Sequence, residues 1–132
     1  MVKVSRAVHD ELVAHALADR PYEVCGLLAG REGEVSQAFR ARNKEQSTVR
    51  YEIDPADLLR IFREIDDADL EHLGIYHSHT HTQAYPSDTD KRLAYYPEAL
   101  YFIVSLLDER APHVRAFRIV DGAVTEEPIA IG

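Results

Sequence analysis

Three histidines lie close together in the middle of the chain and could bind a metal ion. They are His77, His79 and His81, each separated from the next by one residue. Successive side chains of a β-strand alternate between its two faces, so all three imidazoles would project to one side if the preceding strand continued through them. Zn²⁺ binds imidazole nitrogen at about 2.0 Å in tetrahedral geometry. The spacing therefore favours a zinc site over the usual roles of single histidines, which are surface or core residues.

A serine and an aspartate that follow the histidines have both a structural and a chemical interpretation. Ser87 and Asp90 have the spacing of a capping box, in which a serine caps a helix and an acidic residue three positions on bonds back to it. That helix start would direct the Asp90 carboxylate toward the histidines, and a carboxylate oxygen can complete a nitrogen-rich zinc site. On spacing alone, the ligand sets His77/His79/His81 and His77/His79/Asp90 remain close competitors.

Glu23 could supply the proton transfer that a zinc site needs for hydrolysis. A glutamate between a helix and a strand is usually solvated, and Glu23 gains interest only because an attacking water needs a nearby carboxylate to take its proton. The only cysteine, Cys25, lies within the apolar run 24–28. Small buried cysteines are common, so we predict that Cys25 packs in the core and takes no part in the chemistry.

The elements that must position these residues can be predicted from apolar spacing, capping residues and turns. Ser5 starts a helix that ends at Pro21, and Asp54 with Pro55 starts a second helix that extends to Ile65. Strands are predicted at 24–29, 35–40, 49–53, 73–76, 100–106, 114–120 and 124–131, with tight turns at 30–33 and 121–122. A third helix starts after Ser87. This mixture predicts one α/β (α+β) domain over residues 1–132.

Composition and charge exclude several classes of partner. The chain has 132 residues with 15 basic and 23 acidic side chains, a formal net charge of −8, which argues against binding to nucleic acid or an anionic membrane. The longest nearly apolar run, 99–107, is far shorter than the ~20 residues of a transmembrane helix. A single cysteine and an N-terminus without an apolar signal segment predict a cytoplasmic protein.

The five candidate residues together resemble the signature of the JAMM (MPN+) zinc peptidases. That signature is a distant glutamate, then His-x-His, seven residues, a serine, two residues and an aspartate. Glu23, His77, His79, Ser87 and Asp90 match it position by position. The resemblance extends over nearly the whole chain. It implies a mixed central β-sheet flanked by helices, an architecture similar to that of cytidine deaminases.

The resemblance also implies a role for each of the five residues. His77, His79 and Asp90 would bind one Zn²⁺, which decides against His81. Glu23 would act as the general acid and base of amide hydrolysis, and Ser87 would donate a hydrogen bond to the developing oxyanion. The loop 80–87 and the segment 118–128 look most like those of compact actinobacterial members. Those enzymes release cysteine from the C-terminal Gly-Gly of a ubiquitin-like sulfur-carrier protein, which is the substrate partner expected here.

Three other functions compete with this hypothesis. A general isopeptidase for ubiquitin-like proteins remains an alternative, because it would use the same residues. A non-catalytic scaffold with the same fold is disfavoured, because all five signature positions are present. A zinc nucleobase deaminase is excluded, because its Pro-Cys-x-x-Cys motif needs two cysteines and this chain has one. The oligomeric state is left open.

Overall fold

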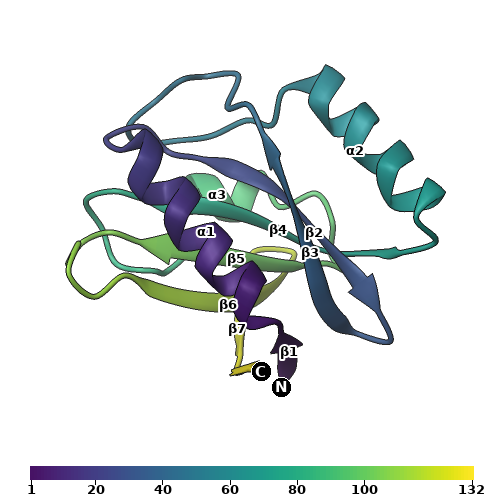
Figure 1. Ribbon diagram of the computed structural model, residues 1–132. Helices are drawn as coiled ribbons and strands as arrows, with labels where there is room; N and C mark the ends of the chain where they lie inside the picture. Colours follow the sequence, from purple (N-terminus) through teal and green to yellow (C-terminus); the bar gives the residue numbers. More distant parts are fainter.

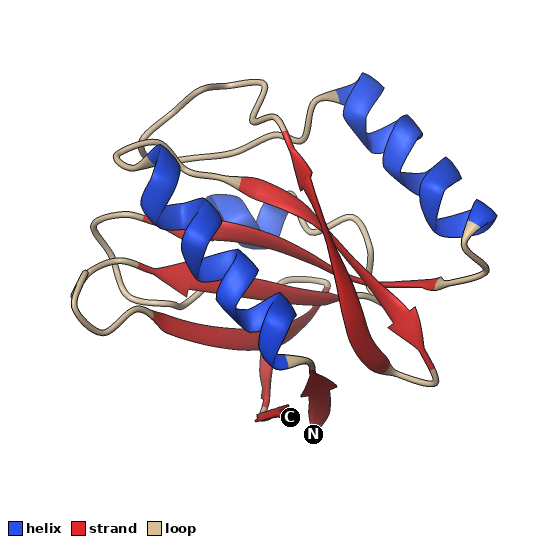
Figure 2. Cartoon of the chain, in the orientation of Figure 1, coloured by secondary structure: helices blue, strands red, loops and turns tan.

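The computed structural model describes residues 1–132 and contains one sheet with three helices (Figures 1 and 2). The helices are α1 (Arg6–Asp19), α2 (Pro55–Asp67) and α3 (Asp88–Arg92). The strands are β1 (Val2–Val4), β2 (Cys25–Arg31), β3 (Glu34–Ala41), β4 (Glu71–His79), β5 (Leu100–Ser105), β6 (His113–Val120), β7 (Ala123–Glu127) and β8 (Ile129–Ile131). None of the three helices has the length and apolar character that a transmembrane span requires.

The sheet is mixed, as the family resemblance implies. Its strand order is β7-β6-β5-β4-β2-β3-β1-β8. The pairs β4–β5, β1–β3 and β1–β8 are parallel, and the other neighbours are antiparallel. Strands β7 and β8 lie at opposite ends of this order although only Pro128 separates them in the chain. The sheet must therefore curl until its two edges approach each other, and the two termini lie side by side in Figure 1.

Helix α1 covers one face of the sheet, crossing in front of the strands in Figure 1. It begins as predicted, because the Ser5 side chain accepts a hydrogen bond from the Val8 amide and caps the first turn. Its buried residues Val8 and Leu12 pack against Tyr76 and other apolar side chains of the sheet. Burying apolar area of this kind is the main force that holds a helix on a sheet.

Helix α2 packs against the opposite face, near β2 and β3. It begins at Asp54, whose carboxylate accepts hydrogen bonds from the free amides of Ala56 and Asp57. Ile61 and Ile65 then pack against Cys25 and its neighbours in a second core cluster. Cys25 is fully buried there, which confirms its predicted packing role.

Two tight turns form where they are predicted. Glu32 and Gly33 connect β2 and β3 with φ angles of 54° and 74°, and Asp121 and Gly122 connect β6 and β7 with 50° and 79°. Two consecutive positive φ angles are characteristic of the hairpin turn that matches the natural twist of the strands.

The structure differs from the predicted strands at four main points. The segment 49–53 forms a loop with one isolated bridge, Asn43 to Ile53, and Val49 is 72% exposed. Its polar main-chain groups bond to the Asn43 side chain and to Lys44, which replaces a strand ladder. The predicted strand 124–131 is divided at Pro128, which has no amide hydrogen for pairing. Strand β1 was not predicted, and β4 extends beyond 73–76 to include both His77 and His79.

Candidate active site

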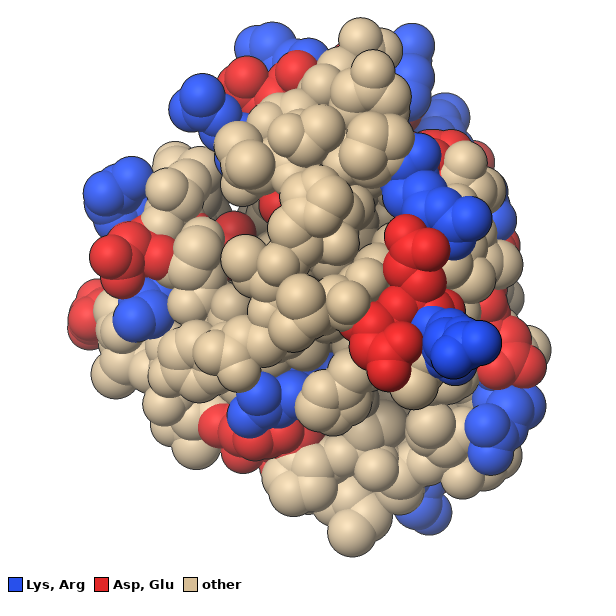
Figure 3. Space-filling view, turned by 90° about the vertical axis from the view of Figure 1, so that its left-hand side faces the viewer, with Lys and Arg blue, Asp and Glu red and all other residues tan.

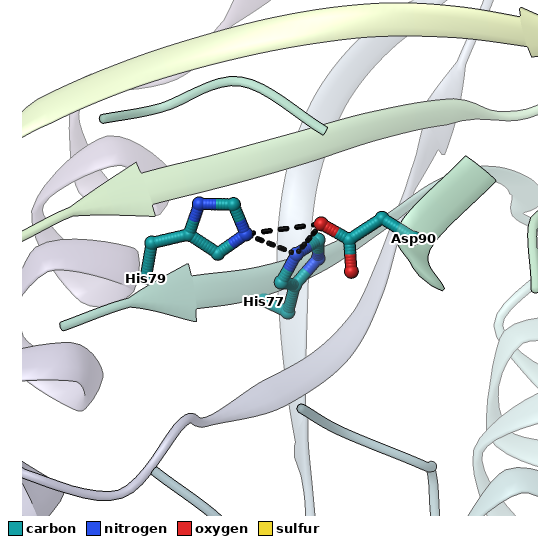
Figure 4. Close-up of side chains that lie close together, drawn as sticks. All are labelled: His77, His79 and Asp90. Atoms are coloured by element: carbon teal, nitrogen blue, oxygen red, sulfur yellow. Dashed lines mark hydrogen bonds and ion pairs between the residues drawn. The ribbon is translucent and has the colours of Figure 1, made fainter. Parts of the chain in front are cut away.

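Strand β4 holds the first two candidate residues rigidly. It lies between β2 and β5, so both of its edges are hydrogen-bonded up to the histidines. His77 is paired with Cys25 on β2 and Ile103 on β5, and His79 is paired with Ser105 on β5. Because side chains alternate along a strand, both imidazoles project from the same face, as Figure 4 shows.

Helix α3 brings Asp90 to these imidazoles through the predicted capping box. Ser87 Oγ accepts a hydrogen bond from the Asp90 amide at 3.1 Å, and Asp90 Oδ2 accepts one from the Ser87 amide at 2.9 Å. The carboxylate is thus held at both its main chain and its side chain. In Figure 4, Asp90 points from the start of α3 toward the end of β4.

Three ligand-type atoms converge at this point. Asp90 Oδ2 lies 3.1 Å from His77 Nε2 and 3.0 Å from His79 Nε2, and the two nitrogens are 3.1 Å apart. Ligands at ~2.0 Å around a tetrahedral ion stand roughly 3.3 Å from one another. The three atoms therefore fit one face of such a coordination shell, and these residues could hold a metal ion.

The two imidazoles have different contacts with their surroundings. His79 Nδ1 donates a hydrogen bond to the Gln83 carbonyl oxygen at 2.8 Å, which leaves the lone pair of Nε2 directed at the cluster. The His77 ring is stacked on Tyr51, with 4.3 Å between ring centroids. His77 Nδ1 is buried and has no hydrogen-bond partner.

The electrostatics of the cluster favour an ionised Asp90 beside a neutral His77. Burial alone would raise the pKa of Asp90, but the close contacts with His77 and His79 and the hydrogen bond from the Ser87 amide hold it well below its usual range. Burial lowers the pKa of His77, and the nearby Asp90 carboxylate offsets only part of that effect. An anionic oxygen with a neutral imidazole is the state in which these groups bind metal ions.

Glu23 lies beside the cluster, just before β2. Its side chain is buried, and its Oε1 atom has no hydrogen-bond partner. Burial raises the pKa of Glu23 to about 7; the charge of His79 opposes this rise and that of Asp90 adds to it. A buried carboxylate with a pKa in this range can both accept and release a proton near neutral pH.

The structure thus brings together four of the candidate side chains with Ser87 at their edge, and it separates them from His81. His81 is exposed in the loop after β4 and is not part of the cluster. Sequence reasoning missed Tyr51, which it placed in a strand, and Asn43, whose side chain holds the loop 43–53. The polar residues of that loop carry no local pattern that would have identified them.

Two clefts adjoin these residues. One, of about 1040 Å³, is lined by polar and charged residues that include Glu23, Asn43 and Lys44. The other, of about 510 Å³, is mostly apolar and is lined by residues that include Tyr51, Thr89 and Tyr96. Figure 3 shows the left-hand side of Figure 1, where uncharged atoms fill much of the middle, acidic and basic side chains lie around them, and a small hollow has acidic atoms beside it.

Comparison with known proteins shows which family this chain is similar to. The family described as prokaryotic homologs of the JAB domain matches residues 5–120. The CysO-cysteine peptidase of Mycobacterium tuberculosis (strain ATCC 25618 / H37Rv) is 47% identical over 122 residues, which cover 91% of this chain and 84% of that protein. The desampylase of Haloferax volcanii is 36% identical over 103 residues, covering 73% of this chain and 74% of its own.

The fold is also similar to that of a solved structure. The solution structure of a Desulfitobacterium hafniense protein, 34% identical in sequence, superimposes with a TM-score of 0.91 and covers all of this chain and 93% of its own. The resemblance to the JAMM (MPN+) domain is thereby confirmed, together with the mixed-sheet fold that it implies. The chain belongs to the family of prokaryotic homologs of the JAB domain.

Proposed function

We propose that the protein is a zinc-dependent peptidase that cleaves the amide bond after the C-terminal Gly-Gly of a ubiquitin-like sulfur-carrier protein and releases cysteine. The observation that carries the proposal is the convergence of His77, His79 and Asp90 beside the buried, unpartnered carboxylate of Glu23. The substrate class is supported by the relative named CysO-cysteine peptidase.

In this proposal, His77, His79 and Asp90 would be the three protein ligands of one zinc ion per chain. When bound, the ion supplies Lewis acidity, which polarises the scissile carbonyl and lowers the pKa of water toward about 7. The donor set of two imidazoles and one carboxylate fits Zn²⁺ better than Mg²⁺ or Ca²⁺, which prefer oxygen ligands.

Glu23 moves the proton. Its carboxylate accepts a proton from the attacking water and later donates it to the nitrogen of the departing amine, which would otherwise be a poor leaving group. The pKa of about 7 that burial gives Glu23 suits both steps, because a group with this pKa exchanges its proton readily near neutral pH.

Ser87 stabilises the oxyanion. Its Oγ uses a lone pair to accept the hydrogen bond from the Asp90 amide, so its own O–H remains free to donate. Ser87 is exposed at the edge of the cluster, where a substrate carbonyl can approach. The helix cap and the oxyanion donor are therefore two uses of one hydroxyl. A donor aimed at developing negative charge lowers the barrier of acyl transfer.

A general isopeptidase for ubiquitin-like conjugates is the second candidate function. The relative named desampylase favours it. Its reaction would use the same five residues, and the difference lies only in the leaving group, which is a lysine side chain of a protein instead of one cysteine. In both cases a diglycine tail suits the site, because glycine can lie extended in a narrow groove without steric cost.

Direct cleavage assays test the proposal and separate the two candidates. The protein is loaded with Zn²⁺ and incubated with a sulfur carrier extended by cysteine after Gly-Gly, and separately with the same carrier joined to a lysine side chain. Intact mass spectrometry then reads the products. Release of cysteine supports the proposal, and cleavage of only the lysine conjugate supports the isopeptidase. Failure to cleave either substrate refutes both functions.

The proposal includes a cytoplasmic location for the protein. We place residues 1–132 as one catalytic domain in the cytoplasm, where the single buried cysteine is expected to stay reduced.

A further inference from the structure

Glu23 has no regular secondary structure to hold it in place. Strand β2 begins at Cys25, and the sheet holds the main chain no further back than Val24, whose amide donates to Ser78 Oγ at 2.9 Å and whose carbonyl oxygen accepts from the Ser78 amide at 3.1 Å. Its carboxylate Oε1 has no partner of its own. A side chain without anchoring hydrogen bonds takes its position from the main chain that carries it. The location of this carboxylate therefore depends on what holds the main chain at residue 23.

The loop 43–52 holds that main chain from both sides. The Glu23 amide donates a hydrogen bond to the Ser47 carbonyl oxygen at 2.8 Å. The Glu23 carbonyl oxygen accepts one from Asn43 Nδ2 at 3.1 Å. Both polar main-chain groups of Glu23 thus bond directly to one loop.

Asn43 also holds the loop itself in shape. Its Nδ2 donates a second hydrogen bond to the Arg50 carbonyl oxygen at 3.0 Å, and its Oδ1 accepts from the amides of Glu45 and Glu52 at 3.0 and 3.1 Å. These four hydrogen bonds employ both amide hydrogens and both lone pairs of the side chain. One side chain therefore joins the two ends of the loop to Glu23.

We propose that Asn43 is a positioning residue for the peptidase reaction, because its side chain closes the loop 43–52 around the main chain of Glu23 and so sets where the Glu23 carboxylate stands. This inference rests on the proposed function of Glu23. A displacement of a catalytic group by about 1 Å can cost on the order of 100-fold in rate. Loss of the Asn43 hydrogen bonds should therefore affect turnover more than substrate binding.

The sharpest variant is Asn43→Asp, with Ser47→Ala as its control. Asn43→Asp keeps the size of the side chain and the two acceptor bonds, but it loses both donors and sets an anionic oxygen against the Glu23 carbonyl. Ser47→Ala removes the hydrogen bond of 3.0 Å that the Val49 amide donates to Ser47 Oγ in the same loop, and it leaves the Ser47 carbonyl oxygen that accepts from the Glu23 amide. We expect kcat to fall about 10- to 100-fold in Asn43→Asp with KM changed less than about 3-fold, and both constants to stay within about 2-fold in Ser47→Ala.

Two further measurements separate positioning from general damage. Zinc content of Asn43→Asp is expected to equal that of the wild type, and the Glu23 amide is expected to exchange its hydrogen at least about 10-fold faster, because its bond to Ser47 opens more often. In a Glu23→Ala background, Asn43→Asp should cause no further loss of the residual rate, because it acts only through Glu23.

The proposal is overturned if Asn43→Asp keeps the wild-type kcat, or if it lowers the residual rate of Glu23→Ala by the same factor as the wild-type rate. Asn43→Ser, which removes the amide donors without adding charge, is tested by the same criteria if Asn43→Asp does not fold. If the wild type itself cleaves no carrier substrate, the proposed function fails. Exchange at the Glu23 amide then still decides whether Asn43 holds this main chain.

Discussion

A polar cluster that contains histidine lies on each face of strand β4. The two clusters differ in how many of their polar atoms have hydrogen-bond partners. On the face covered by α1, His15 Nδ1 and the Tyr76 hydroxyl form a hydrogen bond of 2.7 Å, and their rings pack edge to face. On the other face, His77 and His79 meet Asp90. Tyr76 and His77 are adjacent in the chain, but their side chains point to opposite faces of the strand and meet very different environments.

The difference lies in what is left unpaired. His77 Nδ1 and Glu23 Oε1 are the two buried side-chain polar atoms of the chain that lack a hydrogen-bond partner, and both belong to the second cluster. A buried polar atom without a partner costs stability, whereas a fully bonded pair costs little and can make the core more specific. The polar pair on the α1 face therefore contributes to the stability of the fold. The other face gives up stability in exchange for groups that can bind and react.

Removal of Asp90 is the largest change that this comparison predicts. Asp90→Ala is expected to lower zinc affinity more than the 10- to 100-fold that outer-shell changes cost, and to reduce cleavage to background. Metal content after dialysis against a chelator measures the first effect. His81→Ala is the control and should keep both metal and activity. Loss of metal in His81→Ala with retention in Asp90→Ala would refute the ligand assignment.

Glu23→Gln removes the proton carrier and leaves the metal ligands intact. We expect kcat to fall by about 10² to 10⁴, the range that general acid–base catalysis contributes, with zinc content unchanged. The melting temperature should not fall, because the variant removes a buried carboxylate that has no partner on one oxygen. A variant that still cleaves at the wild-type rate would show that another group takes the proton.

Ser87→Ala tests whether one hydroxyl serves both as a helix cap and as an oxyanion donor. We expect kcat to fall about 10²- to 10³-fold and stability to fall by about 1 kcal/mol. Ser5→Ala removes the corresponding cap of α1. This control should lose similar stability and keep kcat. Equal loss of activity in the two variants would assign Ser87 a purely structural role.

The satisfied pair on the α1 face should have the smallest effect on activity, because it contributes to stability alone. Burial lowers the pKa of His15 to about 4; the charge of Arg40 also lowers it, while Asp19 and Glu11 act in the opposite direction. The unfolded chain binds a proton near its ordinary pKa of 6.5, so the folded state loses stability as the pH falls from 6.5 toward 4. The full loss is at most about 3 kcal/mol.

Urea unfolding of His15→Gln across this pH range measures that contribution. Glutamine can keep a hydrogen bond to Tyr76 but does not titrate, so the pH dependence of stability should become flatter than in the wild type. Zinc content and kcat at neutral pH should be unchanged. If His15→Gln loses metal or turnover, the two faces of β4 are coupled and the contrast between them does not hold.

Much of the local structure could be predicted because its signals lie within a few residues. The caps at Ser5, Asp54 and Ser87 formed as predicted, since a cap needs only one side chain and the next free amides. The segment 49–53 shows where such reasoning fails. Its alternating residues satisfy a strand pattern, but the Asn43 side chain takes up the main-chain groups that a strand would pair.

The sequence by itself determined which groups were available for chemistry and how their immediate neighbours would present them. It specified a strand that leads into His-x-His, a capped helix that begins at Ser87, and a glutamate before an apolar run. On spacing alone, it left His81 and Asp90 as close competitors for the third ligand position, and only the family resemblance favoured Asp90.

Only the tertiary structure decided which of these groups meet. Strand β2 pairs with β4 and brings Glu23 beside histidines that are far away along the chain, while α3 turns Asp90 inward and the loop after β4 leaves His81 outside. The physical reason is that strand pairing and core packing act between segments distant in sequence. No local pattern carries that information.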